Sequence, residues 1–384
     1  MRIGHLSTFF PTHCAFPYYT LGLAQGMLAG RRDEHVVLTE AHCPATPRGG
    51  LAVAPCWRRD EDYVPAIVAA ARRQRLEVLL IQYANDIFGD DSRMPRLLAE
   101  LRGAGMATVI NLHSVYPPGA RTRYVPGRDA RSFDRAVAAA AGAVLVHTPR
   151  MRQDLEDRGI AAERIAVIPH GTLLRPRPDR SEARRRFGIP ERAKLVLFFG
   201  FIWPGKGIDF LLDVFARVAR RVPDAFLYVG GYTRKKVFYT RAYMAYLRAR
   251  LRWLGIADRC QLYGDYVADD DVPSLYAAAD VVAMSYRQGY SSSSGVVHQA
   301  AGLDTLMMCS RIAKFDEVGE RISPALLADY GDRRAWVDGL AKLLGDERLA
   351  EDLRVRLRRF AEETSWERVG TQHLDLFDRL RERK

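Results

Sequence analysis

Short apolar runs alternate with helical segments along almost the whole chain. In the first 170 residues these runs have strand length, and the predicted strands are Ile3–Leu6, His35–Leu38, Val78–Gln82, Ala107–Leu112, Ala143–His147 and Ile165–Ile168. The helices predicted between them are Tyr18–Leu28, Tyr63–Gln74, Met94–Gly103 and Ala130–Ala141. Strands separated by helices pair in parallel, because a parallel connection needs a long crossover. The alternation therefore predicts an α/β fold with parallel sheets.

The same alternation resumes after a segment rich in Pro and Arg. The later strands are predicted at Leu195–Phe199, Ala225–Val229, Gln261–Tyr263, Asp280–Met284 and Thr305–Met308, and helices at Ile208–Val222 and Val272–Ala278. A chain of 384 residues is long for one domain. We therefore predict an N-terminal domain over residues 1–172, a linker over 173–190 and a C-terminal domain over 191–364, with a cleft between the two domains.

Composition excludes several classes of protein. Apolar residues make up 48% of the chain, which excludes a disordered protein. The five cysteines are scattered without a CxxC pair, so we expect neither a disulfide framework nor a zinc site. Because no signal peptide or membrane-spanning run is recognisable, we expect a cytoplasmic protein that at most touches the inner membrane face. The net charge of +12 favours acidic small molecules or an anionic membrane surface, and no nucleic-acid motif accompanies it.

The segment Tyr286–Cys309 connects the predicted strand Asp280–Met284 to a helix through a loop of small polar residues. Four serines, Ser291–Ser294, precede Gly295, and a helical pattern begins at Val296. A helix N-terminus leaves N–H groups unpaired and carries a partial positive charge, so it attracts anions. Serines can cap such a helix and bond phosphate oxygens. The loop indicates a phosphate site, and an ordinary capped, serine-rich turn is the alternative interpretation.

Ligands of open parallel sheets bind outside the carboxyl ends of the strands. In the first domain this rule selects the loop containing His13, the segment from Gln82 to Phe88, His113, and His170. His113 is the strongest candidate, because it ends a strongly apolar strand before a long loop rich in Pro and Gly. A neutral imidazole there can orient a substrate hydroxyl or accept its proton. A hydrogen-bonded loop histidine without a catalytic role is the alternative.

Two charged segments bear on partners and metals. Basic and aromatic residues interleave over Thr233–Trp253, a predicted helix that suits an anionic membrane or an acidic acceptor. A surface helix whose aromatic side chains pack inward is the favoured interpretation. The run Asp269–Asp271 is predicted to be a helix-capping turn. We expect no metal site and no cofactor.

Over essentially its whole length the chain resembles the retaining GT-B glycosyltransferases of family 4, the glycosyl transferases group 1. The resemblance rests on the order and spacing of IQYANDIFG (81–89), VINLHSVYP (109–117), VLVHTPRMRQDL (144–155), IAVIPHGT (165–172), FFGFIWPGKGIDFLL (198–212), SYRQGYSSSSGVVHQAAGLDTLMMCS (285–310) and SWERVGTQHLDLF (365–377). It implies two facing Rossmann-like domains, the first for the acceptor and the second for a nucleotide sugar, with a closing helix over 365–384. It also implies sugar transfer from a UDP- or GDP-linked donor to a saccharide, lipid-linked or small-molecule hydroxyl, with retained configuration and no essential metal.

The resemblance also assigns roles to individual residues. Lys206 falls on the lysine that contacts the donor diphosphate, and His113 on the histidine near the transferred sugar, so these two are the catalytic candidates. The donor-binding candidates are Gly200, Lys206, Gly230, Tyr290, Ser293, Ser294, Gly295, Val296 and His298. The acceptor-binding candidates are His13, Gln82 and Phe88.

The chain departs from the family pattern at three points. The usual pair of glutamates is absent, and by spacing Tyr290 and His298 take those places. The arginine expected just before the lysine is missing, with Phe201 and Trp203 at the candidate positions. The N-terminal Gly-Gly loop is replaced by residues 13–16. These departures leave open a GT-B relative with other chemistry, such as an epimerase or phosphorylase, or a catalytically silent nucleotide-sugar-binding subunit.

Overall fold

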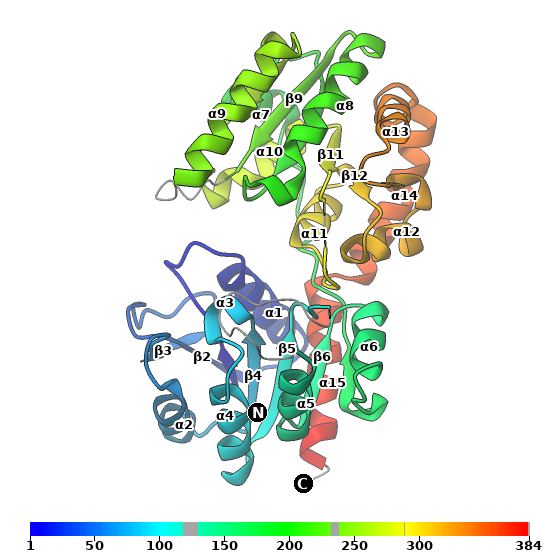
Figure 1. The fold of residues 1–384 in the computed structure, drawn as a ribbon. Helices are drawn as coiled ribbons and strands as arrows, with labels where there is room; N and C mark the ends of the chain where they lie inside the picture. Colours follow the sequence, from blue (N-terminus) through cyan, green and yellow to red (C-terminus); the bar gives the residue numbers. More distant parts are fainter. Residues whose placement is uncertain (118–129, 232–237, 288, 383–384) are drawn as a thin grey trace. The chain divides into compact units, whose positions relative to one another are not determined.

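The computed structural model describes residues 1–117, 130–231, 238–287 and 289–382 (Figure 1). The chain divides into two compact units. The N-terminal unit comprises residues 1–171, 290–293 and 364–384, and the C-terminal unit comprises residues 172–289 and 294–363. Each unit contains one parallel sheet with helices around it, so the predicted α/β class with two Rossmann-like domains is confirmed.

The N-terminal unit is built on a seven-stranded sheet in the order β3-β2-β1-β4-β5-β6-β7. Its strands are β1 (Arg2–Leu6), β2 (Glu34–Glu40), β3 (Ala52–Trp57), β4 (Val78–Tyr83), β5 (Ala107–Leu112), β6 (Ala143–Val146) and β7 (Ile165–Val167). Its helices are α1 (Phe16–Gly30), α2 (Tyr63–Arg73), α3 (Asn85–Phe88), α4 (Arg93–Gly103), α5 (Ala130–Ala140), α6 (Pro149–Glu156) and α15 (Trp366–Glu382).

This sheet is covered by helices on both faces. Along β4, Leu79 and Ile81 belong to the core shared with α2 and α4, whereas Val78 and Leu80 belong to the core shared with α1 and α15. Successive strand residues point to opposite faces, so a strand between two cores must be apolar at every position. This explains the uninterrupted apolar runs from which the strands were predicted.

The C-terminal unit is built on a six-stranded sheet in the order β10-β9-β8-β11-β12-β13. Its strands are β8 (Lys194–Phe199), β9 (Ala225–Gly230), β10 (Cys260–Leu262), β11 (Val281–Met284), β12 (Leu306–Ser310) and β13 (Leu327–Ala328). Its helices are α7 (Arg180–Phe187), α8 (Ile208–Arg221), α9 (Phe238–Trp253), α10 (Val272–Ala278), α11 (Gly295–Gly302), α12 (Asp316–Arg321), α13 (Arg333–Gly345) and α14 (Glu347–Glu363).

Two strands, β3 and β13, were not among the predictions. Both lie at an edge of their sheet. β3 contains Pro55, which an edge strand tolerates because it has fewer ladder hydrogen bonds to complete. β13 has only two residues, Leu327 and Ala328. Edge position and short length both weaken the sequence signal of a strand.

The Pro- and Arg-rich segment leads into α7, whose arginines anchor it to the C-terminal unit. Arg184 is buried and donates from Nη2 to the Ala193 carbonyl at 2.7 Å. Arg180 and Arg184 both form ion pairs with Asp280, the residue before β11. The arginines of this segment therefore make structural contacts and do not serve only as a solvent-exposed surface.

The helix α15 packs against α1 through glycines at the crossing point. A Cβ on Gly26 would lie 2.0 Å from the Trp366 carbonyl oxygen, and a Cβ on Gly370 would lie 2.5 Å from the Gly26 carbonyl carbon. No Cβ can occupy these positions unless the two backbones separate. The C-terminal helix thus belongs to the N-terminal unit because two glycines allow the backbones to touch.

We predict that Gly370→Ala destabilises the protein by about 1–3 kcal/mol, because the added methyl overpacks the crossing of α1 and α15. The measurement is a chemical denaturation curve. The matched control is Gly103→Ala at the end of α4, where a Cβ meets nothing within 4 Å. Equal stability of the two variants would contradict the close crossing.

Candidate functional site

The site in the C-terminal unit lies where the strand order reverses. From β8 the chain proceeds outward through β9 and β10, then returns to place β11 on the other side of β8 and continues to β12 and β13. In open parallel sheets the loops after two such strands diverge and leave a binding crevice at the carboxyl edge. The loops after β8 and β11 contain Lys206 and the serine-rich segment.

Two hydrogen bonds to backbone carbonyls join the loop after β8 to the residues that follow β11. Ser285 Oγ donates to the Gly207 carbonyl at 3.0 Å, and the Arg287 N–H donates to the Gly205 carbonyl at 3.0 Å. Gly207 has a φ of 62°, and a Cβ there would lie 2.0 Å from the Ser285 carbonyl oxygen. Glycine is therefore required at this position, and Lys206 beside it has a fixed place.

The ammonium group of Lys206 lies against an aromatic ring. Its Nζ is 3.6 Å from the ring centroid of Tyr286, which is buried at the end of β11. Burial, followed by the positive charge of Lys314, lowers the pKa of Lys206 to about 7. Among the described residues no carboxylate forms an ion pair with Lys206. A partly buried cation that lies on a π face is well suited to receive an anion.

The helix α11 begins at Gly295, which is exposed, and Ser294 stands at its N-cap position. The prediction that serines cap this helix is wrong for Ser294, whose side chain makes no capping hydrogen bond. The N–H groups of Gly295 and Val296 come too early in the helix to have an intrahelical acceptor. They remain the natural anion ligands of this loop.

The predicted donor-binding residues are divided between the two units. Tyr290 and Ser293 belong to the N-terminal unit, where the Val115 N–H donates to the Ser291 carbonyl at 2.8 Å. The Tyr290 ring packs on Tyr116 with a centroid separation of 4.3 Å. The others lie in the C-terminal unit, and of these Gly200 and Gly230 touch, since the Gly200 N–H donates to the Gly230 carbonyl at 3.2 Å.

His298 lies inside the C-terminal unit and not at the exposed start of α11. Its side chain is 2% exposed, with Nδ1 at 2.7 Å from Thr172 Oγ1 and Nε2 at 3.5 Å from Glu317 Oε2. Its ring also packs on Phe360. In the described structure His298 is thus a hydrogen-bonded core residue, which is one of the ordinary uses of a histidine.

In the N-terminal unit the structure brings Gln82 and His113 together at the ends of β4 and β5. His113 Nε2 is 2.8 Å from Gln82 Oε1, and Asn111 Nδ2 donates to the same oxygen at 3.0 Å. His113 Nδ1 is 3.3 Å from Nε2 of His147, which the sequence analysis did not assign to the site. His147 Nδ1 is 3.0 Å from the Ile168 carbonyl, which can only accept, so Nδ1 of His147 donates there.

Of the two other predicted acceptor residues, Phe88 is buried and His13 is exposed. Phe88 is 1% exposed and stacks on Trp57 with a centroid separation of 4.9 Å. The Phe88 ring thus fills a core, and contact of Phe88 with an acceptor stays a prediction. His13 is exposed in the loop after β1, and β1 and β4 flank the reversal of strand order in this sheet.

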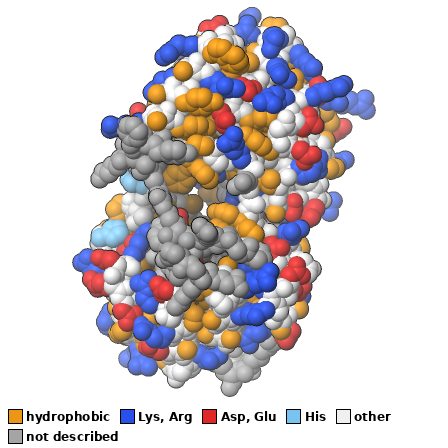
Figure 2. Space-filling view, in the orientation of Figure 1, with side chains coloured by type: hydrophobic (Ala, Val, Ile, Leu, Met, Phe, Trp, Pro, Cys, Tyr) orange, Lys and Arg blue, Asp and Glu red, His pale blue; other side chains and the backbone are white. Residues whose placement is uncertain are grey.

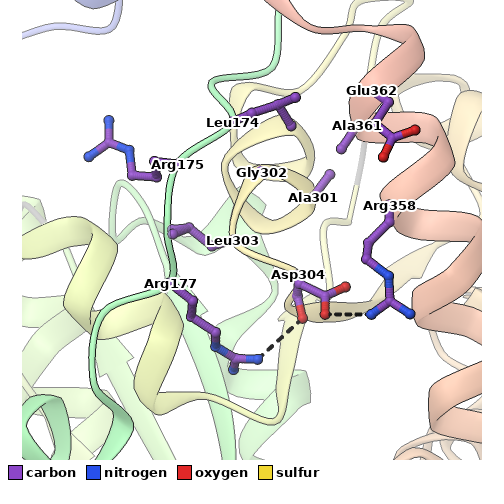
Figure 3. A pocket seen from close by; sticks show the side chains of 10 residues that line it. All are labelled: Leu174, Arg175, Arg177, Ala301, Gly302, Leu303, Asp304, Arg358, Ala361 and Glu362. Carbon is purple, nitrogen blue, oxygen red and sulfur yellow. Dashed lines mark hydrogen bonds and ion pairs between the residues drawn. The ribbon is translucent and has the colours of Figure 1, made fainter.

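A cavity of about 260 Å³ lies at the C-terminal end of α11, opposite the end that begins with Gly295. Figure 3 shows the residues that line it. It is lined by Leu174, Arg175, Arg177, Ala301, Gly302, Leu303, Asp304, Arg358, Ala361 and Glu362. Arg358 Nη1 donates to Asp304 Oδ2 at 2.9 Å, and Arg177 donates to backbone carbonyls. Arg358 and Asp304 form an ion pair in the lining of this cavity, which contains none of the predicted site residues.

The basic helix α9 has both inward and outward aromatic residues. Tyr243 is 8% exposed and packs in the core, whereas Tyr246 and Trp253 are 44% and 77% exposed. Residues 233–237 of the predicted segment lie outside the described residues. Figure 2 shows Lys and Arg distributed over the visible face of both units without one dominant patch. Membrane contact by α9 stays a prediction.

Two properties of the described residues bear on the sequence predictions. Within these ranges no helix is both long and apolar enough to cross a membrane. Over the same residues no group of three or more His, Cys, Asp or Glu side chains is placed to hold a metal ion. The run Asp269–Asp271 forms a 3₁₀ turn before α10, although Asp271 makes no side-chain capping bond.

Both units match one family of proteins. Residues 193–346 match the family described as glycosyl transferases group 1, and residues 17–171 match the glycosyl transferase 4-like domain. The chain is 30% identical over 258 residues to the D-inositol 3-phosphate glycosyltransferase of Salinispora tropica, covering 64% of this chain and 52% of that protein. It is 34% identical over 160 residues to the mannosylfructose-phosphate synthase of Agrobacterium fabrum, covering 40% of this chain and 34% of that protein. The chain thus spans about half the length of the first relative and a third of the second.

Solved structures share the fold over the whole chain. HepE of Anabaena in complex with UDP and glucose has a TM-score of 0.75 at 15% identity and covers 98% of this chain and 99% of that one. The sucrose-phosphate synthase of Thermosynechococcus elongatus has a TM-score of 0.76 at 17% identity and covers 100% of both. Identities this low support the fold alone. Together with the family matches over both units, they show that this chain belongs to the group 1 glycosyltransferases of the GT-B fold.

Proposed function

We propose that the protein is a glycosyltransferase that moves a sugar from a UDP- or GDP-linked donor to a hydroxyl of a saccharide, lipid-linked or small-molecule acceptor, with retained configuration. The observation that carries the proposal is Lys206, held against Tyr286 at the reversal of the C-terminal sheet. The names of the relatives, and the UDP and glucose bound by HepE, support a nucleotide-sugar donor.

The chemistry needs stabilisation of a diphosphate leaving group. Negative charge grows on the diphosphate as its bond to the sugar breaks. Lys206 and the first N–H groups of α11 are fixed in place, so they stabilise that charge without rearranging during the reaction. Retention through a covalent intermediate would need a carboxylate nucleophile. We propose instead that the acceptor attacks from the face that the diphosphate leaves.

In the N-terminal unit, we assign His113 to the acceptor or to the transferred sugar. Both of its ring nitrogens have partners, Gln82 Oε1 at 2.8 Å and His147 Nε2 at 3.3 Å. A substrate hydroxyl must therefore share or replace the Gln82 contact to reach Nε2. This arrangement favours a positioning role for His113 over that of a general base with a free nitrogen.

A nucleotide-sugar-binding subunit without turnover is the second candidate. His298 favours this second candidate, because it takes the place of a family glutamate and its ring is hydrogen-bonded to Thr172 in the core. Release of nucleoside diphosphate from UDP-glucose or GDP-mannose without added acceptor decides between the two. The glycosyltransferase releases it slowly by hydrolysis, whereas the silent subunit binds the donor and releases none.

We predict that Lys206→Ala slows donor hydrolysis by about 30- to 1000-fold, because it removes one charge-assisted contact worth about 2–4 kcal/mol to the leaving group. The rate of nucleoside diphosphate release measures this. The control is Lys342→Ala on α13, an exposed lysine of the same unit. A rate for Lys206→Ala within about threefold of the control would remove Lys206 from the mechanism.

We predict that Gly295→Asp abolishes binding of UDP and GDP, because it places a negative charge at the start of α11. Ser294→Ala removes at most one hydrogen bond and should weaken binding by about tenfold or less. Calorimetric titration of both nucleotides measures the affinities. The control is Gly345→Asp at the end of α13, where an added Cβ meets nothing within 4 Å. Unchanged affinity in Gly295→Asp would show that this loop is not the phosphate site.

We predict that UDP affinity falls as the pH rises from about 7 to about 9. The pKa of Lys206 in the free protein is lowered to about 7, so the ammonium group deprotonates across this range and the anion loses a partner. The groups that face Lys206 are Tyr286, which burial keeps neutral, and Lys314, whose burial-lowered pKa of about 8 adds in the same direction. The Lys206→Ala variant should show a shallower dependence, and an identical pH profile in both proteins would contradict the assignment.

A further inference from the structure

A second lysine lies beside the proposed diphosphate site, at the end of a third strand. Lys314 belongs to the short turn Ala313–Phe315, which follows β12. β12 is the neighbour of β11 in the sheet, so its carboxyl end lies at the same edge as the loops after β8 and β11. No motif in the sequence pointed to a role for this turn.

Tyr286 and Gly289 connect this turn to the loops of the site. The Tyr286 ring contacts Phe315, with centroids 5.2 Å apart, and the same ring lies under Lys206. A Cβ on Gly289 would lie 3.3 Å from Lys314 Cβ and 2.7 Å from Ile312 Cδ1. The loop after β11 therefore passes directly against the turn, and a Cβ at position 289 would displace the end of the Ile312 side chain.

We propose that Lys314 is the second cation of the diphosphate site beside Lys206 and takes the place of the arginine that the chain lacks before Lys206. This inference rests on the proposed nucleotide-sugar site. The candidate positions for that arginine are occupied by Phe201 and Trp203, which are 48% and 53% exposed and carry no charge. A diphosphate carries several negative charges, and one lysine neutralises only part of them.

The electrostatics of the free protein agree with such a pair. Lys206 and Lys314 are close enough for the charge of Lys314 to lower the pKa of Lys206. Burial lowers the pKa of Lys314 to about 8, and Glu317 opposes that shift. Glu317 is buried and is shared with His298, at 3.5 Å from its Nε2. Two neighbouring lysines repel each other until an anion lies between them, so a bound diphosphate interacts favourably with both.

The test is calorimetric titration of UDP and of inorganic pyrophosphate into the full-length protein and into Lys314→Met, which keeps the length of the side chain without its charge. Both anions should bind at least about tenfold more weakly to Lys314→Met, as expected for a lost charge-assisted contact. Lys314→Arg keeps the charge and should retain most of the affinity. Lys342→Met is the matched surface control and should bind like the unchanged protein. Melting curves of all variants show whether each is folded, and Lys314→Gln replaces Lys314→Met if the latter is not.

The outcomes separate this inference from the proposed function. If the unchanged protein binds UDP or GDP, and folded Lys314→Met or Lys314→Gln binds within about twofold of it, the role of Lys314 is overturned and the proposed function stands. If the unchanged protein binds pyrophosphate but neither UDP nor GDP, and Lys314→Met weakens pyrophosphate binding, the two-lysine anion site is supported. The nucleotide-sugar function is then overturned. If neither a nucleoside diphosphate nor pyrophosphate binds to the unchanged protein, both are overturned.

Discussion

The candidate donor site depends on the close backbone contact between Gly207 and Ser285. The two residues follow strands that are neighbours in the sheet but distant in the sequence, and the hydroxyl of Ser285 donates to the Gly207 carbonyl. A side chain at Gly207 would collide with the Ser285 backbone. This contact holds Lys206 against Tyr286 before any ligand arrives. Catalytic stabilisation of charge is effective when the groups that provide it are already in place.

In the N-terminal unit, hydrogen bonds hold the candidate site residues in place in a similar way. The Ile168 carbonyl fixes the donor atom of His147, which in turn fixes the orientation of His113, and Gln82 holds the other side of that ring. Because most of these groups are buried, each depends on its neighbours for hydrogen bonding. His113 is therefore a precisely oriented group rather than a mobile loop residue.

The strands, and the placement of several site candidates in loops at strand ends, were predictable from local sequence because their signals are local. An apolar run between two cores predicts a buried strand, and a lysine between glycines after such a run predicts a loop at the carboxyl edge. Local signals do not show which of the candidate side chains are buried. Phe88 follows a strand end yet fills the core beside Trp57, and His298 stands one turn into α11 yet faces Thr172 and Glu317.

By itself, the sequence determined the α/β class, the two repeats of strand and helix, and the family to which they belong, because apolar periodicity and motif order are properties of the chain. Only the tertiary structure decided which charged groups share a neighbourhood. Lys206 and Lys314 are more than 100 positions apart in the chain, and the sheet order β8-β11-β12 brings their loops to one edge. Strand order is set by packing of the whole unit, so no local pattern could have paired these two lysines.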